Sequence, residues 1–161
     1  MTPLVPEAQA WLEAARDPRT AARLESIYNE VAQAIAERAP ACWASGRCCN
    51  FERLGHRLYV TGLETAYAVS RLERGTHPEL SILSLTQART RGGCPFQVKN
   101  VCGIHRIKPL SCRVYFCDRS AQQWQKELSE RMHAAIKALH DEEGIEYRYA
   151  EWRSLLDLFT S

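Results

Sequence analysis

Apolar residues recur at helical spacing in the first quarter of the chain. Residues 18–39 carry an apolar stripe on one helical face: Leu24, Ile27, Tyr28, Val31 and Ile35. Asp17 can cap this helix, Pro18 fits its first turn, and Pro40 stands where the helix should end. The pattern predicts a long amphipathic helix, preceded by a shorter helix over residues 7–16.

A second long helix is predicted over residues 120–143. Its apolar positions share one face: Trp124, Leu128, Met132, Ile136 and Leu139. Ser120 and Gln123 have the spacing of a capping box at its start. We expect this face to pack against the stripe on the helix over residues 18–39. The alternating segment "IEYRY" then predicts a short strand, and "AEWRSLLDLF" predicts a final helix.

The middle of the chain shows a different pattern. Residues 57–75 predict a short extended piece and a third helix, with a capping box formed by Thr61 and Glu64 and an end at Gly75. Between this helix and the long C-terminal one the periodicity fades, and glycines and prolines predict a loop. The expected fold is therefore mainly α, a small helical bundle with cysteine-rich loops and one or two short strands.

Length and composition place few limits on function. The chain has 161 residues and a mass of 18.3 kDa, which suits one domain, with a motif region over residues 42–117 and a helical region over 119–161. It contains no apolar run of transmembrane length, and its first residues do not resemble a signal peptide. Its net charge of +2 predicts neither a nucleic-acid nor a membrane partner, and no specific partner is indicated. We expect a cytoplasmic protein.

The seven cysteines fall into two patches, and this is the strongest chemical signal in the sequence. The first patch, "CWASGRCC", runs from Cys42 to Cys49, and the second runs from Cys94 to Cys117. In a reducing cytosol disulfides are rare, and an odd number of cysteines would leave one unpaired. Cysteines used only as small apolar residues would be scattered along helix faces. The clustering therefore predicts metal or redox chemistry rather than inert core positions.

The spacing leaves the identity of the metal open. No C-x2-C pair of the zinc-ribbon type occurs, and the closely spaced cysteines of bacterial ferredoxins are absent. Thiolate ligands suit zinc or an iron–sulfur cluster, and seven thiols exceed what one zinc ion needs. Cys48 and Cys49 are adjacent, and neighbouring side chains in an extended chain diverge, so both seldom reach one small ion. The pair therefore favours a larger cluster, two metals, or one ligand beside a second thiol. A vicinal disulfide between them is the remaining alternative.

Basic residues accompany both patches. The segment from Cys94 to Arg119 has a net charge of about +4, and the first patch with its flank has about +2. Nearby cations would stabilise a centre with four thiolates, although a solvated basic face that meets an anionic ligand fits the same pattern. His105 is a candidate ligand, an acid–base group or a packed histidine. We expect His56 and His77 to face solvent.

These motifs resemble the YkgJ-type cysteine-cluster family, which is described as a putative zinc- or iron-chelating domain. Cys42 matches the first family cysteine, Cys48 and Cys49 match its tandem pair, and Cys94–Pro95 matches its Cys-Pro. The closing element, C-x-I-Y-x-x-R-P-x-x-C-R, is matched by Cys102, Ile104, Pro109, Cys112 and Arg113. The chain departs from the pattern at three positions: Ser45 replaces a cysteine, His105 a tyrosine and Lys108 an arginine.

The resemblance implies a metal centre whose ligands come from the matched cysteines. The candidate metal residues are Cys48, Cys49, Cys94, Cys102, Cys112 and Cys117. Among these we expect Cys94, Cys102, Cys112 and one of the tandem pair to be direct ligands, with Cys42 and the other thiols close by. An iron–sulfur cluster, of the 4Fe-4S type, is the expected cofactor, and zinc is the alternative.

Three functions remain open at this point. The chain is expected to be a metal-binding protein, with a centre that is structural, electron-transferring or metal-handling. A zinc-binding domain is one alternative. The other is an enzyme that uses its centre to modify a protein, because longer relatives of the family include flagellin lysine methylases. We further expect the metal to bring the two patches together and to replace the missing hydrophobic burial in the second patch.

Overall fold

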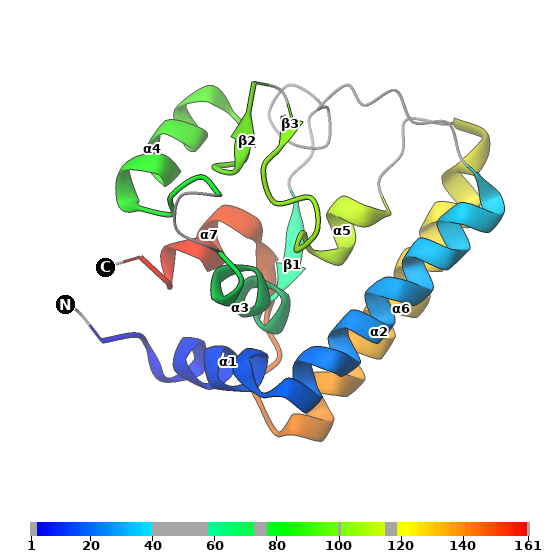
Figure 1. The fold of residues 1–161 in the computed structure, drawn as a ribbon, viewed down its shortest axis with the longest axis horizontal. Helices are drawn as coiled ribbons and strands as arrows, with labels where there is room; N and C mark the ends of the chain where they lie inside the picture. The colour runs from blue at the N-terminus through cyan, green and yellow to red at the C-terminus, as the bar shows by residue number, and fades with distance from the viewer. Residues whose placement is uncertain (1–2, 40–57, 73–76, 100, 115–118, 161) are drawn as a thin grey trace.

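The protein is mainly helical, as the apolar pattern predicts (Figure 1). The computed structural model describes residues 3–39, 58–72, 77–99, 101–114 and 119–160. Within these ranges it contains seven α-helices, a short 3-10 helix (η2, Arg119–Ala121) and two two-stranded antiparallel sheets. The strands are short, so helix packing rather than sheet formation builds the core.

Two consecutive helices form the N-terminal part. α1 (Pro6–Arg16) and α2 (Pro18–Arg38) are separated only by Asp17, whose carboxylate accepts a hydrogen bond of 2.9 Å from the backbone N–H of Arg19. Pro18 occupies the first turn of α2, where its missing N–H has no cost. The predicted cap and the predicted bounds of both helices are therefore confirmed.

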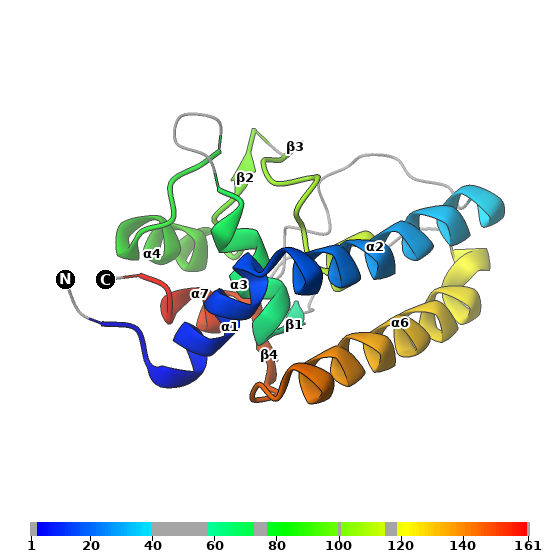
Figure 2. The ribbon, with the colours of Figure 1, turned by 60° about the horizontal axis from the view of Figure 1, so that its bottom comes forward.

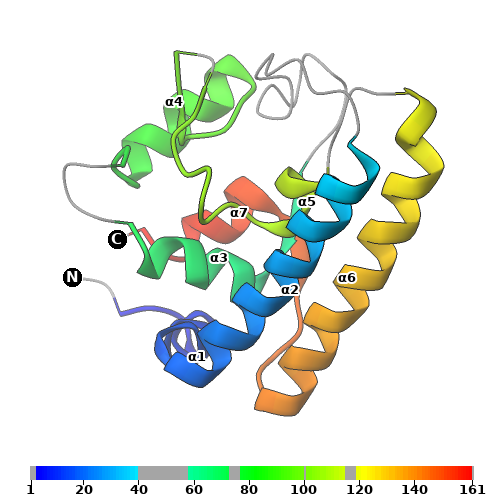
Figure 3. The same ribbon diagram turned by 45° about the vertical axis from the view of Figure 1, so that its right-hand side comes forward.

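The two long helices lie side by side along one edge of the molecule (Figures 2 and 3). α6 (Gln122–Glu143) buries Leu128, Met132, Ile136 and Leu139, and α2 buries Leu24, Tyr28 and Val31 in the same core. This confirms the predicted pairing. The predicted Ser120–Gln123 capping box is wrong, because η2 displaces the helix start and makes Ala121 the N-cap, without a side-chain cap. No helix among the described residues combines the length and the apolar character needed to cross a membrane.

A short buried helix occupies the centre. α3 (Gly62–Ser70) packs against α1 and is preceded by β1 (Tyr59–Thr61), which pairs with β4 (Tyr149–Glu151). The capping box of Thr61 and Glu64 is confirmed. α3 ends at Ser70 rather than at Gly75, so the predicted helix is too long. The apolar residues that favoured a longer helix, such as Leu72, still pack against the core beyond the helix end.

The structure adds a helix that the sequence pattern did not predict. α4 (Ile82–Arg91) begins at a capping box of Ser81 and Ser84 and ends at Gly92, which has the left-handed φ of 74°. Only Leu85 and Ala88 on this helix are buried, so its apolar periodicity is weak. The predicted final helix is present as α7 (Trp152–Asp157).

The described part of the second cysteine patch, residues 94–99 and 101–114, is a folded segment rather than a loop without a core. It contains a hairpin of β2 (Gln97–Val98) and β3 (Val101–Cys102), followed by α5 (Leu110–Arg113). Its apolar side chains lie in the main core: Phe96, Ile104, Ile107, Leu110 and Val114. The expectation that a metal must replace missing hydrophobic burial here is therefore wrong. The core positions of this segment could not be predicted from the sequence, because glycines and prolines interrupt the regular spacing of its apolar residues.

A buried histidine lies near the end of α6. His140 is fully buried, and its Nδ1 lies 2.9 Å from the carbonyl oxygen of Glu146. Its Nε2 is buried and has no hydrogen-bond partner among the described residues. Burial lowers the pKa of His140 below its usual value of 6.5, although Glu64 and Asp141 act in the opposite direction. The folded protein therefore favours neutral His140.

Stability is expected to fall as the pH drops below 6.5. The unfolded chain binds a proton at the ordinary pKa of histidine, whereas folded His140 binds it only at lower pH. Between these two pKa values, protonation therefore stabilises the unfolded state relative to the folded state. The variant His140→Asn keeps a donor for Glu146 and cannot become charged. Urea denaturation between pH 7 and 5 should show a smaller pH dependence for this variant than for the wild type. Equal dependence in both proteins would contradict a role for His140.

Candidate metal centre

Cys94 lies in a buried position between α4 and β2. The residue is 5% exposed and follows the pair of glycines that ends α4. Its Sγ accepts a hydrogen bond of 3.4 Å from the indole Nε1–H of Trp152, the first residue of α7. The Trp152 ring also packs against Phe96, with 6.0 Å between ring centroids. The sulfur therefore lies in an apolar surrounding with a donor directed at it.

Cys102 is positioned by the hairpin. It lies opposite Gln97 at the end of β3, and the next residue, Gly103, donates a backbone hydrogen bond of 2.8 Å to the carbonyl of Phe96. A Cβ at position 103 would lie 2.5 Å from that carbonyl oxygen, so only glycine fits. The hairpin thus joins the backbone beside Cys102 to the residue that follows Cys94–Pro95.

His77 supports the same hairpin from the other side. Its Nδ1 lies 2.9 Å from the carbonyl oxygen of Gly103, and a Cβ at position 103 would also lie 3.0 Å from the Cδ of Pro78. The side chain is half-buried, so the prediction that His77 faces solvent is wrong in part. No sequence signal marked this contact, because the two segments are distant along the chain.

Cys112 lies on α5, which is joined to the core by a buried carboxylate. The backbone N–H of Leu110, at the start of this helix, donates a hydrogen bond of 2.7 Å to Glu64 Oε1. The backbone N–H of Cys112 in turn donates to the carbonyl of Pro109, at 3.1 Å. Cys112 is half-buried against the core. Its position therefore depends on Glu64 of α3, which is 46 positions before Leu110 in the chain.

Glu64 is the most heavily hydrogen-bonded buried acid of the described residues. It is 1% exposed, and its carboxylate accepts bonds from the Thr61 backbone N–H and hydroxyl as well as from Leu110. The hydroxyl of Tyr28 donates to the same carboxylate, at 3.1 Å. Burial and the nearby Glu64 raise the pKa of Tyr28, which therefore stays a donor. The capping-box spacing predicted one of these bonds but not the junction of α2, α3 and α5.

Arg113 holds the turn between β3 and α5 together. Its Nε–H and Nη2–H donate to the carbonyls of Lys108 and Arg106, at 2.8 and 2.9 Å. Its guanidinium lies over the Tyr28 ring, 3.9 Å from the centroid. A lysine could not make this planar set of contacts. These backbone hydrogen bonds explain why the residue after Cys112 is an arginine.

His105 is exposed rather than packed in the core. Its Nε2 lies 3.3 Å from the ammonium nitrogen of Lys108. The positive charge of Lys108, then partial burial and Arg113, lower the pKa of His105. The alternative of a packed histidine is therefore wrong, whereas roles as a ligand or an acid–base group stay untested.

The structure describes three of the six candidate metal residues, Cys94, Cys102 and Cys112. Cys94 lies just before the hairpin, Cys102 lies at its end and Cys112 lies on the helix that follows; no disulfide joins these three to one another. Among the described residues no three His, Cys, Asp or Glu side chains are grouped as a metal site. Cys42, Cys48, Cys49 and Cys117 lie outside the described residues, as does His56. A complete site would need thiols from that part of the chain.

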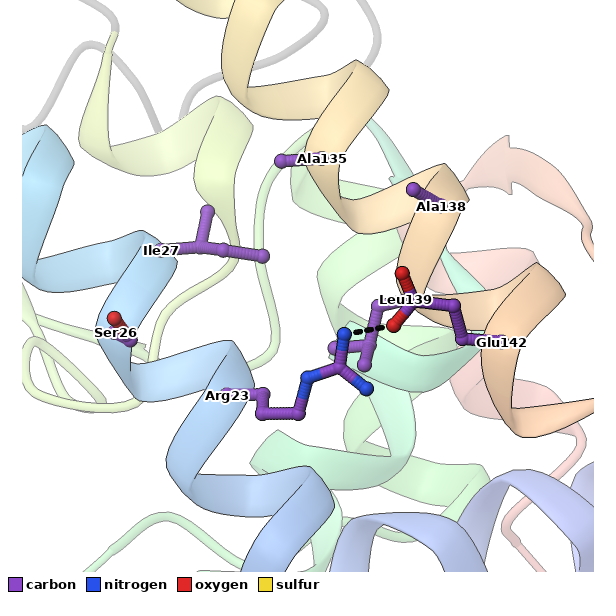
Figure 4. Close-up of a pocket in the computed structure, with 7 residues that line it drawn as sticks. All are labelled: Arg23, Ser26, Ile27, Ala135, Ala138, Leu139 and Glu142. Atoms are coloured by element: carbon purple, nitrogen blue, oxygen red, sulfur yellow. Dashed lines mark hydrogen bonds and ion pairs between the residues drawn. The ribbon is translucent and has the colours of Figure 1, made fainter.

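A surface groove lies elsewhere in the molecule. A cavity of about 330 Å³ separates the exposed edges of α2 and α6 and is bordered by the ion pair of Arg23 and Glu142 (Figure 4). Ile27 and Leu139 form its apolar wall, beside two alanines of α6. Its lining comes from these two helices alone and includes no residue of the cysteine segment. The groove is therefore not part of the candidate centre.

Comparison with protein-family models, with curated proteins and with solved structures finds no match to this chain. The assignment of a function therefore depends on the residues themselves.

Proposed function

We propose that this chain binds a metal centre through cysteine thiolates, and that the centre is a 4Fe-4S cluster. The proposed ligands are Cys94, Cys102, Cys112 and one of Cys48 or Cys49, with Cys117 nearby. The observation that carries the proposal is the surrounding of Cys94, whose buried sulfur faces an indole N–H. A neutral thiol is a weak acceptor, whereas a thiolate is a strong one, so this buried donor favours a sulfur in the thiolate form.

The scaffold of the other two cysteines supports the same proposal. Cys102 and Cys112 occupy positions defined by Gly103 and by Glu64, and both are partly accessible from outside the core. Rigid placement of ligands by surrounding hydrogen bonds is what a metal centre requires. When bound, a four-iron cluster supplies one-electron redox chemistry or a structural link between ligands.

Charge at the site also fits a thiolate centre. Arg106, Lys108 and Arg113 lie within seven residues of Cys112, and the described residues 101–114 contain no acidic residue. Four thiolates give a cluster excess negative charge, which nearby cations stabilise. The resemblance to the YkgJ-type family points to the same cysteines. A centre of this kind belongs in a reducing, cytoplasmic compartment.

Protein purified without oxygen is expected to contain iron and acid-labile sulfide and to be brown. The variant Cys112→Ser should lose most of the iron, because serine is a poor ligand for iron in a cluster. Ser111→Ala is the matched control, since it changes the neighbouring residue of α5 and removes interactions with the Tyr59 carbonyl and the Tyr149 side chain rather than with a cysteine. Metal analysis and the visible spectrum provide the readout.

Zinc and the absence of metal are the informative contrary results. Stoichiometric zinc without iron or sulfide would contradict the 4Fe-4S cluster and would support a zinc-binding domain that uses the same thiols. A protein without any metal would overturn the proposal as a whole. A Cys112→Ser variant with full metal content would remove Cys112 from the ligand set.

A further inference from the structure

Trp152 makes a contact that its role in the core does not explain. The side chain is fully buried, and indole is a hydrogen-bond donor without an acceptor function. A buried indole N–H usually finds an oxygen acceptor, as Trp11 does by donating to the carbonyl of Glu146 at 2.7 Å. Trp152 instead donates to the sulfur of Cys94, at 3.4 Å.

The backbone and the ring of Trp152 are held independently of that bond. Its backbone N–H donates to the carbonyl of Leu58 at 2.8 Å, at the edge of the β1–β4 sheet. Phe96, two residues after Cys94, packs against its ring. The indole N–H therefore points at the sulfur because the backbone of Trp152 and its packing against Phe96 place it there.

We infer that Trp152 is a positioning residue for the metal centre, and that its indole N–H tunes the Cys94 thiolate as a ligand. This inference rests on the proposed function. A hydrogen bond to a ligand sulfur stabilises its negative charge, and it does so more strongly when the metal centre is reduced. It also orients the sulfur for binding, which raises the affinity for a metal ion. The C-terminal helix thereby becomes part of a centre whose cysteines all lie earlier in the chain.

The first test is metal affinity, with Zn²⁺ as the probe and reduced, metal-depleted full-length protein. Trp152→Phe is expected to weaken Zn²⁺ binding by about 10-fold, in the range of outer-shell changes at other metal sites. Trp11→Phe is the matched control, because it also removes a buried indole and its hydrogen bond but has no link to a cysteine. The Trp11 variant should bind Zn²⁺ as the wild type does.

Trp152→Phe removes both ring volume and the indole N–H, and a second variant distinguishes the two effects. Trp152→benzothienylalanine keeps the size and shape of indole and replaces the N–H by sulfur. It should weaken Zn²⁺ binding as much as Trp152→Phe does. It also keeps the test open if the phenylalanine variant does not fold.

The second readout is the redox equilibrium of the reconstituted cluster. At a fixed potential set by a dye, the ratio of reduced to oxidised cluster should fall about fivefold in the benzothienylalanine variant, since a donor to the reduced form is lost. The same replacement at Trp11 should leave the ratio unchanged.

The outcomes separate this inference from the function on which it rests. Wild-type protein that binds neither Zn²⁺ nor a cluster would overturn the proposed function. Wild-type protein that binds metal, together with Trp152 variants of equal affinity and equal redox ratio, would overturn the role of Trp152 alone. Equal weakening by the Trp11 and Trp152 variants would show a general effect on the fold and would also overturn it.

Discussion

Replacing Glu64 by glutamine is expected to lower the free energy of unfolding by about 2–4 kcal/mol, since each buried donor left without its acceptor costs about 1–3 kcal/mol. The carboxylate accepts four hydrogen bonds from donors on three elements. Glutamine offers one acceptor oxygen, and its amide group would face donors with a donor of its own. Buried donors that lose their acceptor are costly, so the start of α5 should detach from α3.

The same substitution at Glu25 is the matched control. Glu25 bonds the Tyr67 hydroxyl and Arg71, but its side chain is 46% exposed, so water can replace the lost interactions. Glu25→Gln should change the unfolding free energy by less than about 1 kcal/mol. Chemical denaturation of both variants provides the comparison. A Glu64→Gln protein as stable as Glu25→Gln would show that the buried network does not hold the α5 segment.

Removing the metal is expected to have the second large effect. A metal that binds only the folded chain stabilises it by about 3–4 kcal/mol when its free concentration exceeds the dissociation constant by two to three orders of magnitude. The two cysteine patches are separated by 44 residues, between Cys49 and Cys94, and bringing them together costs a few kcal/mol of chain entropy. Bonds from both patches to one centre would offset that cost.

Hydrogen exchange should show where the metal acts. Metal loading is expected to slow exchange in the tandem-cysteine segment and near Cys112. The amides of Gly103 and Leu110 should stay protected after chelation, since they bond to Phe96 and Glu64 in the core. The same chelator on Cys112→Ser protein is the control and should change little. Equal exchange in loaded and chelated wild-type protein would show that the metal does not organise either patch.

The helical framework follows from the sequence, and the reason is local. The stripes on α2 and α6, the Asp17 cap and the Thr61–Glu64 capping box are patterns within single segments, and short-range physics is enough to interpret them. The errors lie where local patterns are weak. α4 buries only two residues, and the start of α6 depends on η2 rather than on a side-chain cap.

The candidate site divides in the same way. Clustering of cysteines is visible in the sequence and predicts thiolate chemistry, because few other roles require thiols so close together. The partners of those cysteines are not visible. Trp152 lies 58 residues from Cys94, and Glu64 lies 46 residues from Leu110. Neither pair has a spacing rule, since contacts at that distance depend on how the helices pack.

The sequence by itself determined the helical class, the bounds of the N-terminal helices and the pairing of the two long helices, and its clustered cysteines predict where metal chemistry would lie. Only the tertiary structure decided that Phe96, Ile104, Ile107, Leu110 and Val114 pack in the core, that Glu64 joins α2, α3 and α5, and that the Trp152 N–H faces Cys94. The physical reason is that helix propensity and capping act over a few residues, whereas a buried hydrogen bond needs two partners brought together by the whole fold.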